Sequence, residues 1–211
     1  MAITKVSYLN IAPSAASAVT VCASQSPGAG AIVINGSLAS GGVATLAAAQ
    51  LITLVSGGND TGITFTVTGA DPDGNVQTEA ITGASAGTAT GLKFFKTVTS
   101  ITHTGSVATT LTSGNSIISC SPTYFPNCGI APFTLGINMQ LVSGTATFAL
   151  NQVFDDFNTY PADTLWTAHA TLTALSATAS GSLLYPCTGL RIRQTASSSG
   201  VIKAKFVQAG I

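Results

Sequence analysis

The sequence predicts an all-β protein with two β-sandwich or jelly-roll-like domains, a proline-rich linker between them and an extended N-terminal arm. β-Branched and aromatic residues alternate repeatedly with threonine or serine, which is the period-2 pattern of strands with one buried face. These segments recur roughly every 8–12 residues with Gly- and Ser-containing turns, which is typical of sandwiches rather than βαβ units. Much of the apolar content is alanine, so the core is expected to be thin.

An N-terminal arm is expected at residues 1–18. This stretch is nearly uncharged, with Lys5 as its only ionised side chain, and its composition favours flexibility. It could lie across a neighbouring subunit and become ordered on binding. Ser7 and Asn10 interrupt the apolar run that a signal peptide needs, so we expect the chain to fold in a reducing cytoplasm.

The first β-sandwich domain is expected at residues 19–120. Its clearest element is a hairpin, in which residues 63–68 alternate Ile, Phe and Val with Thr, residues 70–75 (ADPDGN) turn, and residues 76–82 return. Proline fixes φ in that turn and glycine tolerates positive φ. Further strands are expected at residues 92–100, 107–112 and 116–120. The alanine-rich residues 40–50 are the one place where a helical turn is expected.

A proline-rich linker is expected at residues 121–132 (SPTYFPNCGIAP), which contain Pro122, Pro126 and Pro132. The β pattern restarts beyond it and predicts a second β-sandwich domain at residues 133–211. Its strands are expected at residues 133–141, 145–154, 166–175, 190–194 and 201–208. The last two are expected to pair as a hairpin over the turn TASSSG.

The scarcity of charge restricts the function. The chain has 7 basic and 7 acidic residues among 211 and a formal net charge of zero, whereas about 25% of residues are charged in an ordinary globular protein. Proteins without net charge tend to associate, so the composition indicates a component of an assembly. The scattered basic residues form no stripe for nucleic acid, and no apolar run reaches the roughly 18 residues of a membrane helix.

Residues 83–87 (GASAG) match the GxSxG pattern of the serine-hydrolase nucleophile elbow around Ser85. Downstream residues that could complete a triad are Asp155, Asp156, Asp163 and His169. An elbow needs a helix after the serine, but strand-like residues follow, so a turn is expected.

Asp155 and Asp156 are adjacent and would point to opposite faces of a strand, so they cannot form a facing acid–base pair. His103 has no second histidine at the spacing of metal ligands. We predict no enzyme and no catalytic residues.

No metal or cofactor site is predicted. Asp71, Asp73 and Asn75 have the spacing that opens a calcium-binding loop, but Val76 occupies the glycine position and Thr82 the glutamate position. We interpret this segment as a β-turn in which side chains cap backbone N–H groups. The sequence also has no phosphate-binding glycine loop with its lysine.

The four cysteines are Cys22, Cys120, Cys128 and Cys187. They contain no CxxC pair, so a zinc site is not expected. Cys120 and Cys128 bracket the proline-rich segment and could pair in an oxidising compartment. The alternative is that all four are free thiols that act as small apolar side chains.

Four basic residues are candidates for a partner contact. Arg191 and Arg193 are two residues apart, as are Lys203 and Lys205, so each pair shares one face of its strand. If the two strands pair as a hairpin, all four charges fall on one face, and an acidic neighbour is expected because like charges repel. That neighbour is either an acidic patch on a partner or one of the residues Asp155, Asp156 and Asp163.

Trp166 is the single tryptophan. Exposed beside Tyr160 and Tyr185, it would suit a stacking platform for carbohydrate, whereas burial in the core of the second domain is the alternative.

Two parts of the chain resemble virion proteins of tailed bacteriophages. Residues 63–82 (ITFTVTGADPDGNVQTEAIT), followed by residues 94–101 (FFKTVTSI), are similar to a strand–turn–strand pattern that is common in those proteins. In the second half the similar pieces are VFDD (153–156), LWTAH (165–169), LRIR (190–193) and VQAGI (207–211). These motifs are spread over about two-thirds of the chain, from residue 63 to residue 211, and contain no catalytic residue.

Within that class, the chain resembles capsid decoration or cement proteins, which commonly bind as trimers or dimers on the outer shell. The resemblance implies a non-enzymatic protein that stabilises the head by bridging neighbouring major capsid subunits. The implied partners are the major capsid protein and copies of the chain itself, with a trimer favoured over a dimer and no nucleic acid or membrane. The implied location is the capsid exterior, after assembly in the host cytoplasm. The alternatives are a tail, connector or head-fibre component, or a host-glycan-binding module on the virion.

Overall fold

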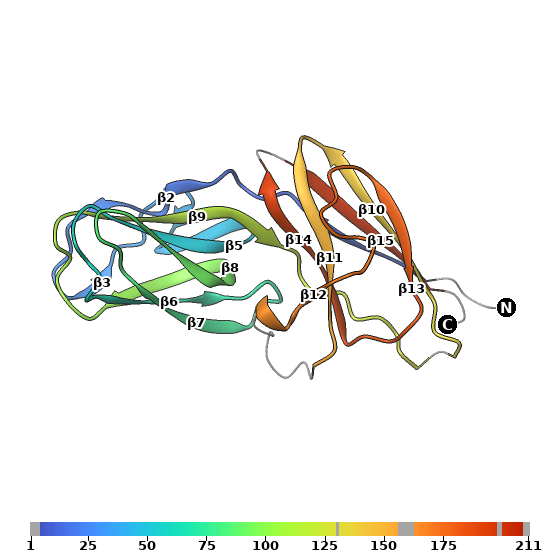
Figure 1. The fold of residues 1–211 in the computed structure, drawn as a ribbon. Coiled ribbons are helices and arrows are strands. Elements are labelled where there is room, and N and C mark those ends of the chain that lie inside the picture. Colours follow the sequence, from blue (N-terminus) through green and yellow to red (C-terminus); the bar gives the residue numbers. More distant parts are fainter. Residues whose placement is uncertain (1–4, 130, 156–162, 198–199, 209–211) are drawn as a thin grey trace. The chain divides into compact units, whose positions relative to one another are not determined.

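The computed structural model describes residues 5–129, 131–155, 163–197 and 200–208 (Figure 1). It consists of strands and one 3₁₀ segment, η1 (Asp163–Leu165), with no α-helix among the described residues. The prediction of an all-β protein is therefore confirmed. In this part of the chain no helix has the length and apolarity to cross a membrane. Unit 1 combines Met1–Pro13 with Cys120–Ile211, and unit 2 is Ser14–Ser119.

Unit 2 is built from antiparallel strands. They are hydrogen-bonded in the order β2-β9-β5-β8-β6-β7, with β3 beside β8 and β4 beside β5. Their bounds are β2 (Ser17–Gln25), β3 (Gly30–Ile32), β4 (Ala39–Ser40), β5 (Val43–Ser56), β6 (Thr64–Ala70), β7 (Val76–Thr82), β8 (Thr88–His103) and β9 (Leu111–Cys120).

The long strand β8 organises unit 2 because it pairs with three other strands. Residues 88–98 pair with β5, residues 97–103 with β6, and residues 101–103 with β3. The predicted alternation is confirmed on β6, where Phe65 and Val67 are fully buried and the alternating Thr64, Thr66 and Thr68 are half-buried. These side chains belong to one apolar core with Phe95, Leu46 and residues from β2, β5 and β9.

The helical turn expected at residues 40–50 is wrong, because most of these residues belong to the 14-residue strand β5. Residues 48–54 are buried on both faces of this strand. Pairing with β8 and burial of Ile52 and Leu54 outweigh the preference of alanine for helix. The strand expected at residues 107–112 also differs, since β9 begins at Leu111.

Unit 1 contains a four-stranded antiparallel sheet in the order β1-β15-β10-β13 and a second set of strands in the order β12-β11-β14. Their bounds are β1 (Lys5–Ile11), β10 (Leu135–Ser143), β11 (Ala146–Val153), β12 (Thr167–Ala168), β13 (Ala179–Leu183), β14 (Gly189–Ser197) and β15 (Val201–Gln208). Buried side chains from both sets include Met139, Phe148, Ile192 and Phe206.

The N-terminal residues differ from the expected arm. Lys5–Ile11 form β1, which pairs antiparallel with β15 along its whole length, from Lys5↔Gln208 to Ile11↔Ile202. Ile11 is buried, so the strand contributes to the core of unit 1. The chain enters unit 2 at Ser14, and β2 begins at Ser17, so residues 1–18 are divided between two units.

The proline-rich residues 121–132 also differ from the expected linker, because they fall within unit 1. Tyr124 exchanges two backbone hydrogen bonds with Leu190, of 2.7 and 2.9 Å, and its ring stacks on Phe206 with 4.3 Å between centroids. The segment is therefore tied to β14 and β15.

The predicted final hairpin is wrong. β14 pairs with β11, whereas β15 lies between β1 and β10 in the other sheet. Ile202, Ala204 and Phe206 are fully buried. This burial and two pairing partners hold β15 in the four-stranded sheet, away from the strand that precedes it in sequence.

Gly69 in the predicted hairpin allows a close approach of two backbones. It lies where the β6–β8 register shifts, and a Cβ atom there would be 1.9 Å from the carbonyl oxygen of Thr97. We expect Gly69→Ala to lower the free energy of unfolding by about 1–3 kcal/mol, measured by urea denaturation, because the backbone has to move. The matched control is Gly62→Ala, whose added Cβ meets no atom within 4 Å. Equal losses in the two variants would contradict this account.

Candidate functional site

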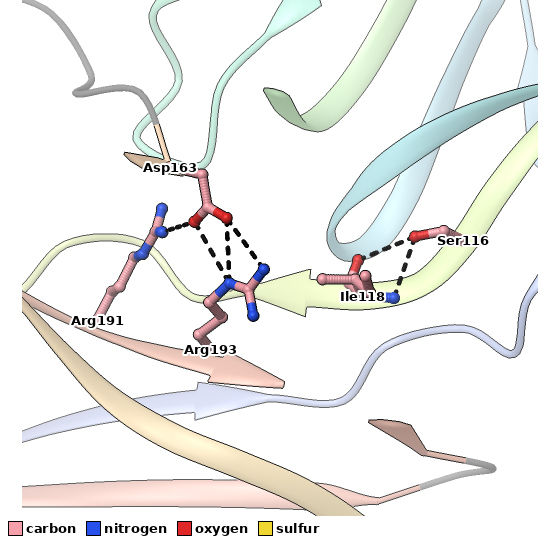
Figure 2. A network of polar contacts seen from close by, with 5 residues as sticks. All are labelled: Ser116, Ile118, Asp163, Arg191 and Arg193. Carbon is pink, nitrogen blue, oxygen red and sulfur yellow. Dashed lines mark hydrogen bonds and ion pairs between the residues drawn. The ribbon is translucent and has the colours of Figure 1, made fainter. Parts of the chain in front are cut away.

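Two arginines and one aspartate form an ion-pair cluster in unit 1. Arg191 and Arg193 lie on β14, and their spacing puts both guanidinium groups on one side of the strand, toward Asp163 at the start of η1 (Figure 2). Arg191 forms an ion pair with Oδ1 of Asp163. Arg193 donates to Oδ2 from Nη2 at 3.0 Å and from Nε at 3.2 Å.

Arg191 is fully buried, whereas the side chains of Arg193 and Asp163 are each 24% exposed. The Arg191 guanidinium carbon lies 4.2 Å from the centre of the Trp166 ring. Because a buried cation is costly without a counter-ion, Asp163 is the group that makes this arrangement stable. Of the two alternatives for the arginine pair, compensation within the chain is confirmed for Asp163. Asp155 is exposed, and Asp156 lies outside the described residues.

The lysine pair is separated from the arginine pair, because β15 and β14 belong to different sheets. The four basic residues therefore do not share one face. Lys203 and Lys205 lie on the side of β15 opposite its buried residues, and neither forms an ion pair within the described residues. Lys203 Nζ lies 4.5 Å from the centre of the Tyr8 ring.

The outward side of β1 and β15 carries Val6, Tyr8, Lys203, Lys205 and Val207, which we call the β1–β15 face. The register places Val6 opposite Val207 and Tyr8 opposite Lys205. Tyr8 is 55% exposed, and Val6 and Val207 are exposed as well. None of the four strands of this sheet contains an acidic residue. The face combines apolar side chains with two positive charges that nothing on the sheet neutralises.

A cavity of about 340 Å³ lies beside the ion-pair cluster in unit 1. Its lining includes Thr147, Asn151, Asp163, Trp166, Arg193 and Thr195. Trp166 is only 5% exposed and has Arg191 over its ring, so burial is the alternative that the structure bears out for this tryptophan. The cavity therefore offers polar and charged groups without an open aromatic platform.

The candidate triad residues are not assembled in either unit. Ser85 lies in an exposed turn of unit 2, and the strand β8 follows it, as the sequence predicts. His169 belongs to unit 1, where its Nδ1 accepts from the N–H groups of Thr171 and Leu172, both at 3.3 Å. Its Nε2 lies 3.3 Å from the carbonyl oxygen of Ser182. Both ring nitrogens are engaged in fixing a loop, which makes His169 a structural residue.

The other histidine, His103, has a similar structural environment in unit 2. Its Nδ1 lies 2.6 Å from the carbonyl oxygen of Gly105, and its ring stacks on Phe65 at 5.6 Å.

The prediction of a capped turn at residues 70–75 is confirmed. Asp71 is buried, and its Oδ1 accepts from the backbone N–H groups of Asp73 at 2.8 Å and Asn75 at 2.9 Å. Its Oδ2 accepts from Asn75 Nδ2 at 3.1 Å. The carboxylate is thus engaged with nitrogen donors, and the described residues contain no cluster of side chains that could hold a metal ion.

All four cysteines are free thiols in the structure. Burial raises the pKa of Cys22 to about 11 and that of Cys187 to about 12. Cys120 is buried and Cys128 is exposed. The Sγ atom of Cys128 donates to the carbonyl oxygen of Cys187 at 3.2 Å.

Comparisons with known proteins give no family. No family model matches the chain, and no curated protein matches it. Among solved structures it is similar to allantoicase from Saccharomyces cerevisiae, with 6% sequence identity and a TM-score of 0.23, over 79% of this chain and 76% of that one. A similarity at this level carries no argument about fold or function.

The sequence indicated the lysines and the arginines as candidates for a partner contact, but it did not predict that β1 contributes to the β1–β15 face. The signal was present in KVSYLNI at residues 5–11, where Val6, Tyr8 and Asn10 alternate with Ser7, Leu9 and Ile11. The low charge and the serine- and alanine-rich residues that follow favoured an arm instead.

Removing the Asp163 charge should destabilise unit 1. In Asp163→Asn the buried Arg191 loses its counter-ion, and we expect a loss of about 3–5 kcal/mol in the free energy of unfolding, measured by urea denaturation. Asp155→Asn is the matched control, because Asp155 is exposed, and it should change stability by less than about 0.5 kcal/mol. A similar small effect in both variants would show that Asp163 does not stabilise the arginines.

Proposed function

We propose that the chain is a non-enzymatic virion structural protein of a tailed bacteriophage, and specifically a capsid decoration or cement protein. It binds the capsid exterior after assembly in the host cytoplasm and bridges neighbouring major capsid subunits. Three features support the proposal: the low charge, the all-β fold, and the resemblance of residues 63–82 and 94–101 to phage virion proteins. Within it, each unit is a β-sandwich of jelly-roll type, and copies of the chain associate, with a trimer favoured over a dimer.

The β1–β15 face is the observation that carries this proposal. Exposed tyrosine and valine side chains gather there with two lysines, in a chain that has only seven basic residues. Interfaces typically combine an aromatic and apolar centre with polar groups that select the partner. A shell protein bound through this face would bury Tyr8, Val6 and Val207 and would place carboxylates opposite Lys203 and Lys205.

The distribution of charge supports an acidic partner. Unit 1 contains five of the seven basic residues and three of the seven acidic ones. The pair of arginines is engaged with Asp163. Lys5 and the two lysines of β15 are therefore the positive charges of this unit that remain for a second protein, and the two on β15 belong to the β1–β15 face.

Capsid particles that lack the chain provide the test. Adding the purified protein should raise the temperature at which the particles release their DNA. The double variant Lys203→Gln/Lys205→Gln should bind the particles about tenfold more weakly in a co-sedimentation assay, which corresponds to a loss of about 1.4 kcal/mol in binding free energy. Binding by the wild type should weaken with added salt, because salt screens the attraction between these half-buried lysines and carboxylates of the partner.

The control is Lys93→Gln, an exposed lysine of unit 2. It should bind like the wild type. Particle stability that does not respond to the wild-type protein would rule out the cement role, and equal binding by the double variant would rule out the β1–β15 face.

The cavity of unit 1 supports a second candidate, a host-glycan-binding module on a tail, connector or head-fibre component. Threonine and asparagine side chains beside Arg193 and Asp163 offer the donors and acceptors that sugar hydroxyls need. Since Trp166 is buried, recognition would use these polar groups rather than stacking on an exposed ring.

Binding of the protein to an oligosaccharide array tests this candidate. Thr173→Trp would fill the cavity, since Thr173 lines it, and should abolish any glycan signal. Thr178→Trp places the same side chain at an exposed residue outside the lining and should leave the signal intact. An absent wild-type signal, or equal signals in the two variants, would reject the candidate.

A further inference from the structure

Cys128 lies against Cys187, although 59 residues separate them in the sequence. Its thiol is directed to the backbone of Cys187, where Sγ lies 3.2 Å from the carbonyl oxygen. A second carbonyl oxygen, that of Pro126, lies 3.6 Å from the same sulfur. The two thiols also interact electrostatically, since a charge on Cys128 adds to the effect of burial in raising the pKa of Cys187.

The backbone on both sides of this contact is anchored. Asn127, next to Cys128, receives a hydrogen bond on its carbonyl oxygen from Gln208 Nε2 at 2.7 Å and donates its N–H to Gln208 Oε1 at 3.2 Å. Gln208 is 1% exposed. In addition, the paired backbones of Tyr124 and Leu190 join residues 121–132, which contain Cys128, to the start of β14, just after Cys187. Two hydrogen bonds therefore tie the segment of Cys128 to β15, and two tie it to Leu190, three residues after Cys187.

We propose that Cys128 and Cys187 are a modification site that forms an intramolecular disulfide when the protein meets an oxidising environment. The inference goes beyond the proposed function and stands whether or not the chain decorates a capsid. It replaces the pairing of Cys128 with Cys120 that the sequence offered. Cys120 is buried at the end of β9, while the sulfur of Cys128 lies against Cys187.

The different exposures of the two cysteines give them different roles. Cys128 is exposed and can react first, whereas Cys187 is 3% exposed, with a pKa raised to about 12. With oxidised glutathione as the oxidant, the Cys128 thiolate attacks the glutathione disulfide and releases one glutathione thiolate. Cys187 then loses its proton, attacks Cys128 Sγ and expels the second glutathione thiolate. One disulfide is made, one is reduced, and two thiol protons pass to the two glutathiones.

The bond would close a loop that contains β10, β11, β12 and β13, and would join residues 121–132 covalently to the turn before β14. A cross-link of this kind restricts the unfolded chain more than the folded one, so unit 1 should become more stable.

Intact-mass measurement of the full-length protein tests the proposal. The reduced protein, incubated with oxidised glutathione at pH 8, should lose the mass of two hydrogen atoms, and peptide mapping without reductant should yield one linked pair that contains Cys128 and Cys187. The unfolding temperature should rise by about 10 °C and return to its starting value with dithiothreitol.

Matched serine variants separate this pair from the other pairings. Cys128→Ser should remove both the mass change and the thermal shift, while Cys120→Ser should keep both. Mapping on the wild-type protein decides the question even if a variant at a buried cysteine fails to fold. A linked Cys120–Cys128 pair, a disulfide between two chains, or a glutathione that stays on Cys128 would each overturn the proposal.

Discussion

The antiparallel pairing of β1 with β15 is the interaction on which the rest of unit 1 depends. It joins residues 5–11 to residues 202–208 and so brings the two ends of the described chain side by side in the four-stranded sheet. Phe206 and Gln208 on β15 then hold residues 121–132, through the stacked ring of Tyr124 and the two hydrogen bonds to Asn127. The same pairing brings Tyr8 beside the two lysines. The proposed binding face and the proposed disulfide site thus both rest on one strand and its neighbours.

The molecule has few charged side chains, and those in the described residues serve different purposes. Asp163 balances Arg191 and Arg193 inside unit 1, where an unpaired guanidinium would be costly. Asp71 caps the N–H groups of a turn in unit 2. Lys203 and Lys205 form no ion pair within the described residues, and the strands of their sheet contain no acidic residue. Such a distribution suits a protein whose few surface charges select a partner while apolar and hydroxyl side chains supply the contact area.

Local patterns in the sequence predicted the local parts of the fold. The hairpin of β6 and β7 was predicted because its turn chemistry and its alternation lie within twenty consecutive residues. The partners of β15 were not, because β1 lies about two hundred residues away and nothing in either strand specifies the other. The alanine-rich β5 was also missed, since its conformation is decided by β8 and by burial on both faces. In the same way, the arginine cluster could be suspected from Asp163, but the contact of Cys128 with Cys187 depends on how residues 121–132 fold back.

Unit 2 is inserted between Pro13 and Cys120 of unit 1, and this order affects how the protein is made. A ribosome makes β1 before unit 2, and makes the strand β15 that β1 needs after unit 2. Unit 2 can therefore acquire its core during synthesis, while β1 stays an unpaired edge until β15 has been made. Closure of unit 1 therefore follows the synthesis of unit 2, since a chain that stops before β15 leaves β1 without this partner and the β1–β15 face unbuilt.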